Sequence, residues 1–262
     1  SWTWGGGWLS EMGFSDFAGS TIVHSVGGWA ALTGALIIGP RIGKYGPNGQ
    51  VNAIPGSNLP LATIGTFILW FGWFGFNGGS QLALGTAADA AAIANVYVNT
   101  NMAACAGLVA ALVLSILLYK KTDLTFVLNG ALAGLVAITA GPDVATPLQA
   151  MIIGAIGGIL TTLAIPLLDK VGVDDVVGAI SVHLVSGIWG TLAVAIPGLN
   201  GSGDMGTQVI GILAIGIFTV ILSAVGWFVL KAVYGLRPTE EEENVGLDIS
   251  ELGMDAYPEF KN

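Results

Sequence analysis

Long apolar stretches with few charges dominate this sequence of 262 residues. About 20 helical residues cross a hydrocarbon core roughly 30 Å thick. Only 10% of the residues are charged, against about 25% in an ordinary soluble domain. The sequence therefore predicts an all-α, polytopic membrane bundle of about seven spans, and glycine and proline interrupt the apolar run within 123–168. The expected spans are 16–40, 59–84, 90–119, 123–141, 147–168, 175–197 and 206–234.

The positive charges all follow odd-numbered spans, so an alternating path places them on one side of the membrane. Loops rich in Lys and Arg stay in the cytoplasm. The sequence therefore predicts an inner (plasma) membrane protein in which the N-terminus of this chain lies outside and the C-terminus lies inside. The loops on the other side carry aspartates but no Lys or Arg. The cations are Arg41, Lys44, Lys120, Lys121, Lys170, Lys231, Arg237 and Lys261.

The net charge of -9 is mostly a property of the C-terminal tail. Residues 240–262 hold eight acids and a single base. We therefore divide the chain into a transmembrane domain, 1–235, and an acidic cytoplasmic tail, 236–262, and a nucleic acid is not an expected partner. A run such as Glu240–Glu243 is usually a solvated stretch.

The first and sixth spans share a pattern that repeats at a constant offset of 159 residues. The second copy lies five spans after the first, so the two copies cross the membrane in opposite directions. Inverted repeats of this kind are typical of transporters and channels, with the functional site between the repeats. The paired positions are Asp16 and Asp175, Gly19 and Gly178, Val23 and Val182, His24 and His183, and Gly28 and Gly187.

His24 and His183 are the only histidines, and the repeat places both deep in the membrane. An ionisable side chain at that depth is costly unless it faces an interior path, so function is the first hypothesis. The alternative is a hydrogen bond between helices. The repeat glycines are expected to allow close helix packing, and Asp16 and Asp175 to cap helix starts.

Five further motifs extend from the first residues to the tail. They are Trp4-Gly5-Gly6-Gly7; Asp16-Phe17-Ala18-Gly19 with His24; Gly72 to Ser80; Asp174-Asp175 with His183; and Gly235-Leu236-Arg237 with Gly246-Leu247-Asp248 and Ala256-Tyr257. In this combination the sequence resembles the ammonium transporter family (Amt/Mep, with the related Rhesus proteins). The resemblance implies an eleven-helix fold of two inverted halves, assembled as a homotrimer. It covers the last helix of the first half, the second half and the final helix, so we expect this chain to be the C-terminal portion of such a transporter.

The resemblance also implies roles for residues along a conduction path. His24 and His183 match the twin histidines of a narrow hydrophobic pore, and Trp73 matches a pore-lining tryptophan. Losing a proton turns ammonium into neutral ammonia, which crosses an apolar constriction far more cheaply than a bare charge does. An imidazole pair can accept or relay that proton, because its unperturbed pKa is about 6.5.

At the outer end, the resemblance implies a site that recruits the ammonium cation. Trp4 and Ser80 match its aromatic face and its hydroxyl, and Phe76 matches one phenylalanine of a gate. Asp16 matches an aspartate that orients this region. An indole face attracts a small cation, so the chemistry agrees with the residue types.

The implied partners are ammonium or ammonia, the lipid bilayer and a PII-type regulatory protein at the tail. We expect neither a cofactor nor a metal, and an enzyme is disfavoured because the apolar spans carry no catalytic motif. The alternative function is a membrane-embedded ammonium sensor that binds without conducting.

Overall fold

The computed structural model describes residues 2–260, and this part of the chain is helical, with one isolated β-bridge between Tyr45 and Val51. The α-helices are α1 (Trp8–Glu11), α2 (Val26–Ile38), α3 (Leu59–Gly79), α4 (Ala87–Tyr119), α5 (Leu124–Ile138), α6 (Pro147–Lys170), α7 (Ser186–Ala193), α8 (Met205–Val233), α9 (Glu240–Val245) and α10 (Leu247–Ser250). Two π-helices, η1 (Ser20–Ser25) and η3 (Ile180–Val185), lead into α2 and α7. Two 3₁₀ turns, η2 (Pro47–Gly49) and η4 (Pro258–Phe260), complete the list.

The seven expected spans each correspond to one helical segment of this structure. Five of them are long and apolar enough to cross a membrane by length and composition: η1 with α2, α3, α4, α6 and α8. The other two, α5 and η3 with α7, are apolar helices of 10–17 residues. They are shorter than predicted because turns at Thr139–Gly141 and Val194–Ala195 end the helices early.

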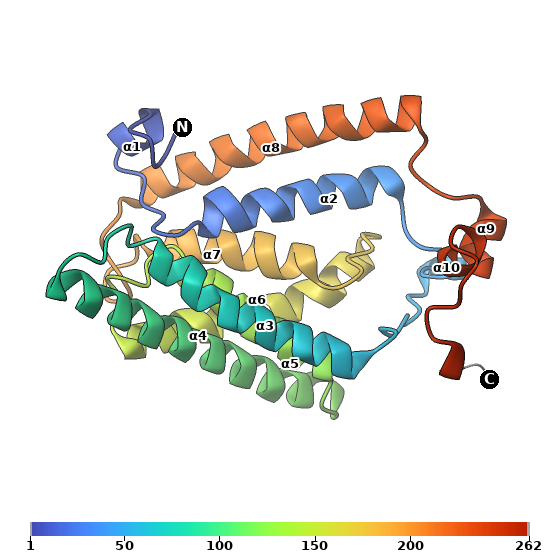
Figure 1. Cartoon of the computed structure of the whole chain (residues 1–262), viewed down its shortest axis with the longest axis horizontal. Coiled ribbons are helices and arrows are strands. Elements are labelled where there is room, and N and C mark those ends of the chain that lie inside the picture. Colours follow the sequence, from blue (N-terminus) through green and yellow to red (C-terminus); the bar gives the residue numbers. More distant parts are fainter. Residues whose placement is uncertain (1, 261–262) are drawn as a thin grey trace.

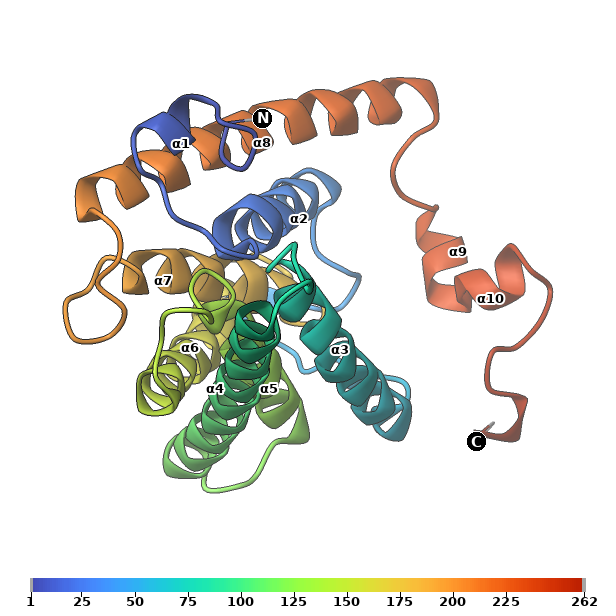
Figure 2. The same ribbon diagram turned by 60° about the vertical axis from the view of Figure 1, so that its left-hand side comes forward.

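Successive long helices run in alternate directions, and together they form one bundle (Figure 1). Helices α3, α4, α5 and α6 fan out below α2, and α8 crosses above α2 (Figure 2). The centre of the fan depends on glycines, because a Cβ at Gly134 or Gly154 would clash with the carbonyl oxygen of Ala103. Small residues at such crossings are the usual way in which membrane helices approach closely.

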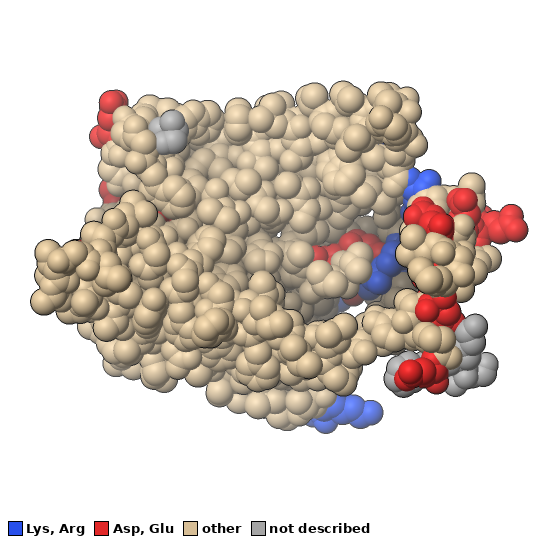
Figure 3. Space-filling model, viewed as in Figure 1, with Lys and Arg blue, Asp and Glu red and all other residues tan. Residues whose placement is uncertain are grey.

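The bundle has two chemically different ends. The loops after α2, α4, α6 and α8 share the end that we call the cation end, where Arg41 contacts Asp174 and Lys44 contacts Asp169, each at 2.8 Å. The cations that are visible in Figure 3 gather there. We call the opposite end, which carries α1, the acidic end. Lys261 lies outside the described residues.

The inverted repeat is visible as reciprocal packing of the two π-to-α segments, which run antiparallel (Figure 1). A Cβ at Gly28 would lie 2.5 Å from Cβ of Leu184, and a Cβ at Gly187 would lie 2.6 Å from Oγ of Ser25. Ser25 and Leu184 are equivalent positions of the repeat, because they are 159 residues apart. The contact of Gly28 with Leu184 and the contact of Gly187 with Ser25 are therefore the same contact made from each side of the repeat. The prediction that these glycines serve close packing is confirmed.

Candidate functional site

Each histidine lies in a π-helix whose start is held by an aspartate. The carboxylate of Asp16 accepts hydrogen bonds from the backbone N–H groups of Ser20, Thr21 and Ile22, at 2.7, 2.8 and 3.0 Å. Asp175 does the same in the second repeat, accepting from Ile180 and Ser181 at 3.0 and 2.9 Å. The capping prediction is therefore confirmed for both aspartates.

The π-helical turns themselves were not predicted. The backbone N–H of His24 donates to the carbonyl of Gly19, five residues earlier, at 3.0 Å. Gly19 adopts a φ of 118°, and its counterpart Gly178 a φ of 80°, a region that favours glycine. Such turns are rare and often occur at functional sites. Here they carry both imidazoles into the space between the repeats.

The two imidazole rings face each other. Nδ1 of His183 lies 3.2 Å from Nδ1 of His24, and the ring planes are inclined by 17° with centroids 5.2 Å apart. One Nδ1 must donate and the other must accept, so the rings have different tautomers when this hydrogen bond forms. Nε2 of His24 is buried and has no hydrogen-bond partner within residues 2–260. The pair can thus hold one proton between the rings while a further nitrogen stays available.

Aromatic side chains of α3 cover the outer face of His24. The indole of Trp73 stacks on the His24 ring at a centroid distance of 4.8 Å, and the Phe76 ring lies 5.4 Å away. The indole N–H of Trp73 donates to Oγ1 of Thr139 at 2.9 Å, which fixes the ring plane. Four predicted residues, His24, His183, Trp73 and Phe76, therefore form one cluster.

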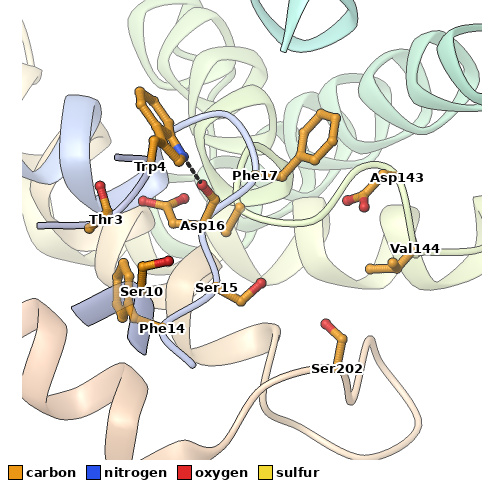
Figure 4. Close-up of a pocket in the computed structure, with 11 residues that line it drawn as sticks. Thr3, Trp4, Ser10, Phe14, Ser15, Asp16, Phe17, Asp143, Val144 and Ser202 are labelled. Atoms are coloured by element: carbon orange, nitrogen blue, oxygen red, sulfur yellow. Dashed lines mark hydrogen bonds between the residues drawn. The ribbon is translucent and has the colours of Figure 1, made fainter. Parts of the chain in front are cut away.

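A separate cavity of about 410 Å³ opens at the acidic end (Figure 4). The indole N–H of Trp4 donates to the backbone carbonyl of Asp16 at 2.9 Å, so two of the predicted outer residues are joined there. Trp4 as a whole residue is 59% exposed. The hydroxyl of Ser80 donates to the carbonyl of Phe76 at 2.9 Å, and within residues 2–260 no hydrogen bond or ring contact joins it to Trp4. The recruitment role of Trp4, Ser80 and Phe76 stays a prediction.

Residues 1–257 match the sequence model of the Ammonium Transporter Family. This chain belongs to that family. It is 44% identical to ammonium transporter Amt2 of Archaeoglobus fulgidus, over 99% of this chain and 60% of the relative. It is 37% identical to the ammonium transporter of Bacillus subtilis, over 98% of this chain and 64% of the relative. The chain thus spans about 60% of the length of these relatives, and its resemblance to the C-terminal portion of the family is confirmed.

Solved structures of the family share the fold. A structure titled "Sensor Amt Protein" is 43% identical with a TM-score of 0.88, covering 95% of this chain and 65% of that one. Candida albicans Mep2 is 28% identical with a TM-score of 0.80, covering 92% and 56%. With its apolar helices, this family member is a multi-pass membrane protein, and its relatives are transporters rather than enzymes.

The loop between α5 and α6 contributes to both sites of this ammonium transporter family member, and sequence reasoning missed it. Three asparagine side chains hold its backbone: Asn99 donates to Pro142 and Ala145, Asn95 to Asp143, and Asn200 to Gly141. Polar asparagines inside an otherwise apolar span were the available signal. The loop supplies Thr139 to Trp73 and Asp143 to the cavity at the acidic end.

A hydrogen bond from the loop after α2 joins the tail of this family member to the cation end, and ion pairs hold the residues on either side of it. The guanidinium of Arg237 holds the pKa of Glu243 down to about 2, and Oε1 of Glu243 also accepts the backbone N–H of Ile42 at 2.9 Å. The two hydrogen bonds from Arg41, at 2.8 Å each, keep the pKa of Asp174 below its ordinary value. Within residues 2–260, no group of three His, Cys, Asp or Glu side chains is arranged to hold a metal ion.

Proposed function

We propose that this chain forms part of an ammonium transport path in which the cation loses its proton and ammonia passes the histidine pair. The observation that carries the proposal is the contact between Nδ1 of His24 and Nδ1 of His183 beneath the rings of Trp73 and Phe76. It joins the two inverted repeats at one point. The family membership supplies the cargo, because the relatives are named as ammonium transporters.

The chemistry favours neutral passage at this point. A bare cation among apolar side chains would lose its hydration at a cost of several kcal/mol or more. Ammonium can avoid that cost by giving up a proton, whereas potassium has no proton to give. A shared Nδ1–Nδ1 hydrogen bond lets a proton move from one imidazole to the other with little motion, and the free Nε2 of His24 can exchange a proton with the cargo.

The charge distribution supports a direction for the path. We assign the cation end to the cytoplasm and the acidic end to the outside of an inner membrane. Under this assignment Trp4 and Asp16 lie at the entrance, and residues 236–262 form a cytoplasmic tail. The exposed apolar rings on α3, such as Phe67 at 64% and Phe71 at 78%, suit contact with lipid or further helices. A homotrimer and a PII-type partner at the tail follow from the family resemblance.

Uptake of labelled methylammonium by proteoliposomes that contain the full chain tests this function. We expect uptake by the wild-type chain and its loss in His183→Ala. Leu184→Ala is the matched control, because it removes a neighbouring buried side chain that carries no proton. Equal uptake by His183→Ala and the wild type would contradict the proposed proton transfer.

The second candidate function is a membrane-embedded sensor that binds ammonium without conducting it. The similarity to the structure titled "Sensor Amt Protein" favours it. The same proteoliposomes separate the two functions: binding of methylammonium with no accumulation by the wild-type chain would support the sensor and contradict transport.

A further inference from the structure

We propose that Gln208 of α8 is a positioning residue for His24, the histidine of the first repeat. The role of His24 in proton transfer rests on the proposed function, but the positioning is argued from contacts alone. Gln208 lies near the start of α8, a helix outside the inverted repeat that crosses above α2 (Figure 2). Its side-chain amide is fully buried in a long apolar helix, where a polar group is costly unless it has a specific use.

The amide of Gln208 pairs with the backbone of Ser15 as a neighbouring peptide group would. Its Oε1 accepts the N–H of Ser15 at 2.9 Å, and its Nε2 donates to the carbonyl of Ser15 at 2.7 Å. Nε2 also donates to the carbonyl of Thr191 at 2.9 Å, in the last turn of α7, where helix carbonyls lack partners within the helix. One side chain thus joins α8 to the segment that leads into η1 and to the helix that follows η3.

These hydrogen bonds are part of a closed cycle between the two repeats. The hydroxyls of Thr191 and Thr21 lie 2.6 Å apart, and the backbone N–H of Thr21 donates to the carboxylate of Asp16 at 2.8 Å. Asp16 follows Ser15 in the chain, so the path returns to Gln208. Each member of such a cycle is held by two others, which makes the arrangement stiffer than a single contact.

The cycle fixes η1 and therefore the imidazole of His24. The carboxylate of Asp16 holds three N–H groups at the start of η1, so a shift of Ser15 and Asp16 would move this helix as a unit. The Nδ1–Nδ1 distance between His24 and His183 is 3.2 Å, already at the long end for a hydrogen bond. A displacement of about 0.5 Å would take the pair beyond hydrogen-bond reach.

Apolar contacts beside the amide bring the same segment to α8. A Cβ at Gly211 would clash with the ring of Phe14, so these two residues are in close contact. The hydroxyl of Thr207 also donates to the carbonyl of Met12, at 3.4 Å. Apolar surfaces tolerate some sliding, whereas hydrogen bonds weaken steeply when they are bent or stretched. The paired bonds of Gln208 therefore set the exact register of the segment along α8.

The second repeat has an equivalent contact at its own entry. Ser15 corresponds to Asp174 at the repeat offset of 159 residues, and each precedes the aspartate that caps a π-helix. Arg41, in the loop after α2, holds the side chain of Asp174 through its backbone N–H at 3.0 Å and its guanidinium at 2.8 Å. The same repeat position is thus clamped twice by different chemistry, which favours a role in placing the histidine that follows.

The test is solid-state NMR of the full chain, labelled with ¹⁵N-histidine, in lipid bilayers without ammonium. The signal measured is the coupling between the two Nδ1 atoms, which a role in stability alone would not change. Gln208→Met has a similar length but makes none of the three hydrogen bonds. It should abolish the coupling and lower methylammonium uptake in proteoliposomes about tenfold or more. Thr219→Val is the matched control, because Thr219 is buried in the same helix and donates within α8, to Ile215 at 2.8 Å. It should keep both coupling and uptake.

Wild-type coupling in Gln208→Met would overturn the inference even if uptake falls, as would an equal loss of coupling in Thr219→Val or its absence from the wild type. If Gln208→Met fails to fold, Gln208→Asn replaces it with the same expected result, because its amide is one methylene too short for both backbones. The coupling is measured without cargo, so a wild-type chain that shows it through Gln208 but takes up no methylammonium removes only the transport proposal. Uptake by a wild-type chain whose histidine signals ignore Gln208 removes only this inference.

Discussion

Replacing Gly28 by alanine should separate the two histidines, because the repeats touch at this glycine. The added Cβ would lie 2.5 Å from Cβ and 2.6 Å from Cα of Leu184, the residue after His183. Ordinary contacts between such atoms are about 3.5–4.0 Å, so α2 and η3 must move apart by about 1 Å. The Nδ1–Nδ1 distance of 3.2 Å would then exceed the range of a hydrogen bond.

The expected cost in stability is about 1–3 kcal/mol, the usual size for overpacking a close contact. Thermal unfolding in nanodiscs measures the loss of stability, and methylammonium uptake in proteoliposomes measures the effect of separating the histidine rings. Gly27→Ala is the matched control, because a Cβ at Gly27 has no neighbour within 4 Å. We expect Gly27→Ala to retain uptake and Gly28→Ala to lose most of it. Equal stability and equal uptake in the two variants would refute the reasoning that close packing aligns the rings.

Two further predictions concern the ion pair at the cation end and the hydrogen bond that holds Trp73. The guanidinium of Arg41 lowers the pKa of Asp174, so their contact stabilises the fold above the unfolded pKa and is lost as the pH falls through the lower folded value. The midpoint temperature of unfolding should therefore fall when the pH is lowered below about 4, the ordinary range of an aspartate. Asp174→Asn should make the midpoint temperature less dependent on pH in that range. The same pH dependence in Asp174→Asn and the wild type would contradict a stabilising ion pair. Thr139→Val should leave the buried indole N–H of Trp73 without an acceptor. We expect it to lower the free energy of unfolding by about 1–3 kcal/mol and to slow methylammonium uptake. Wild-type stability and wild-type uptake in this variant would show that the hydrogen bond does not position the ring.

The sequence alone predicted the apolar segments, the inverted repeat and the depth of His24 and His183, whereas the meeting of the two rings was implied by the family resemblance. Those features depend on hydrophobic length and on identities at a fixed offset, which the sequence displays directly. The role of Asp16 as a cap was also predictable, because a carboxylate at a helix start has few other uses.

Other features depend on contacts between distant segments and could not be predicted. The π-helical turns η1 and η3 were not predicted, because the apolar pattern of a span does not distinguish a π-helical turn from an α-helical one. The early end of α5 and the clamping of its loop need Asn99 and Asn200, which are far away in sequence. For this reason the sequence did not predict that Asp143, a loop aspartate, lines the cavity at the acidic end.

The protonation of the histidine pair is the most direct test of the account. The chain contains only two histidines, so an untagged protein labelled with ¹⁵N-histidine gives signals from just these rings in solid-state NMR in lipid bilayers. We expect one protonated Nδ1 and one unprotonated Nδ1, coupled to each other through the hydrogen bond. Two rings that both carry their proton on Nε2, with no coupling between them, would contradict a shared proton between the repeats.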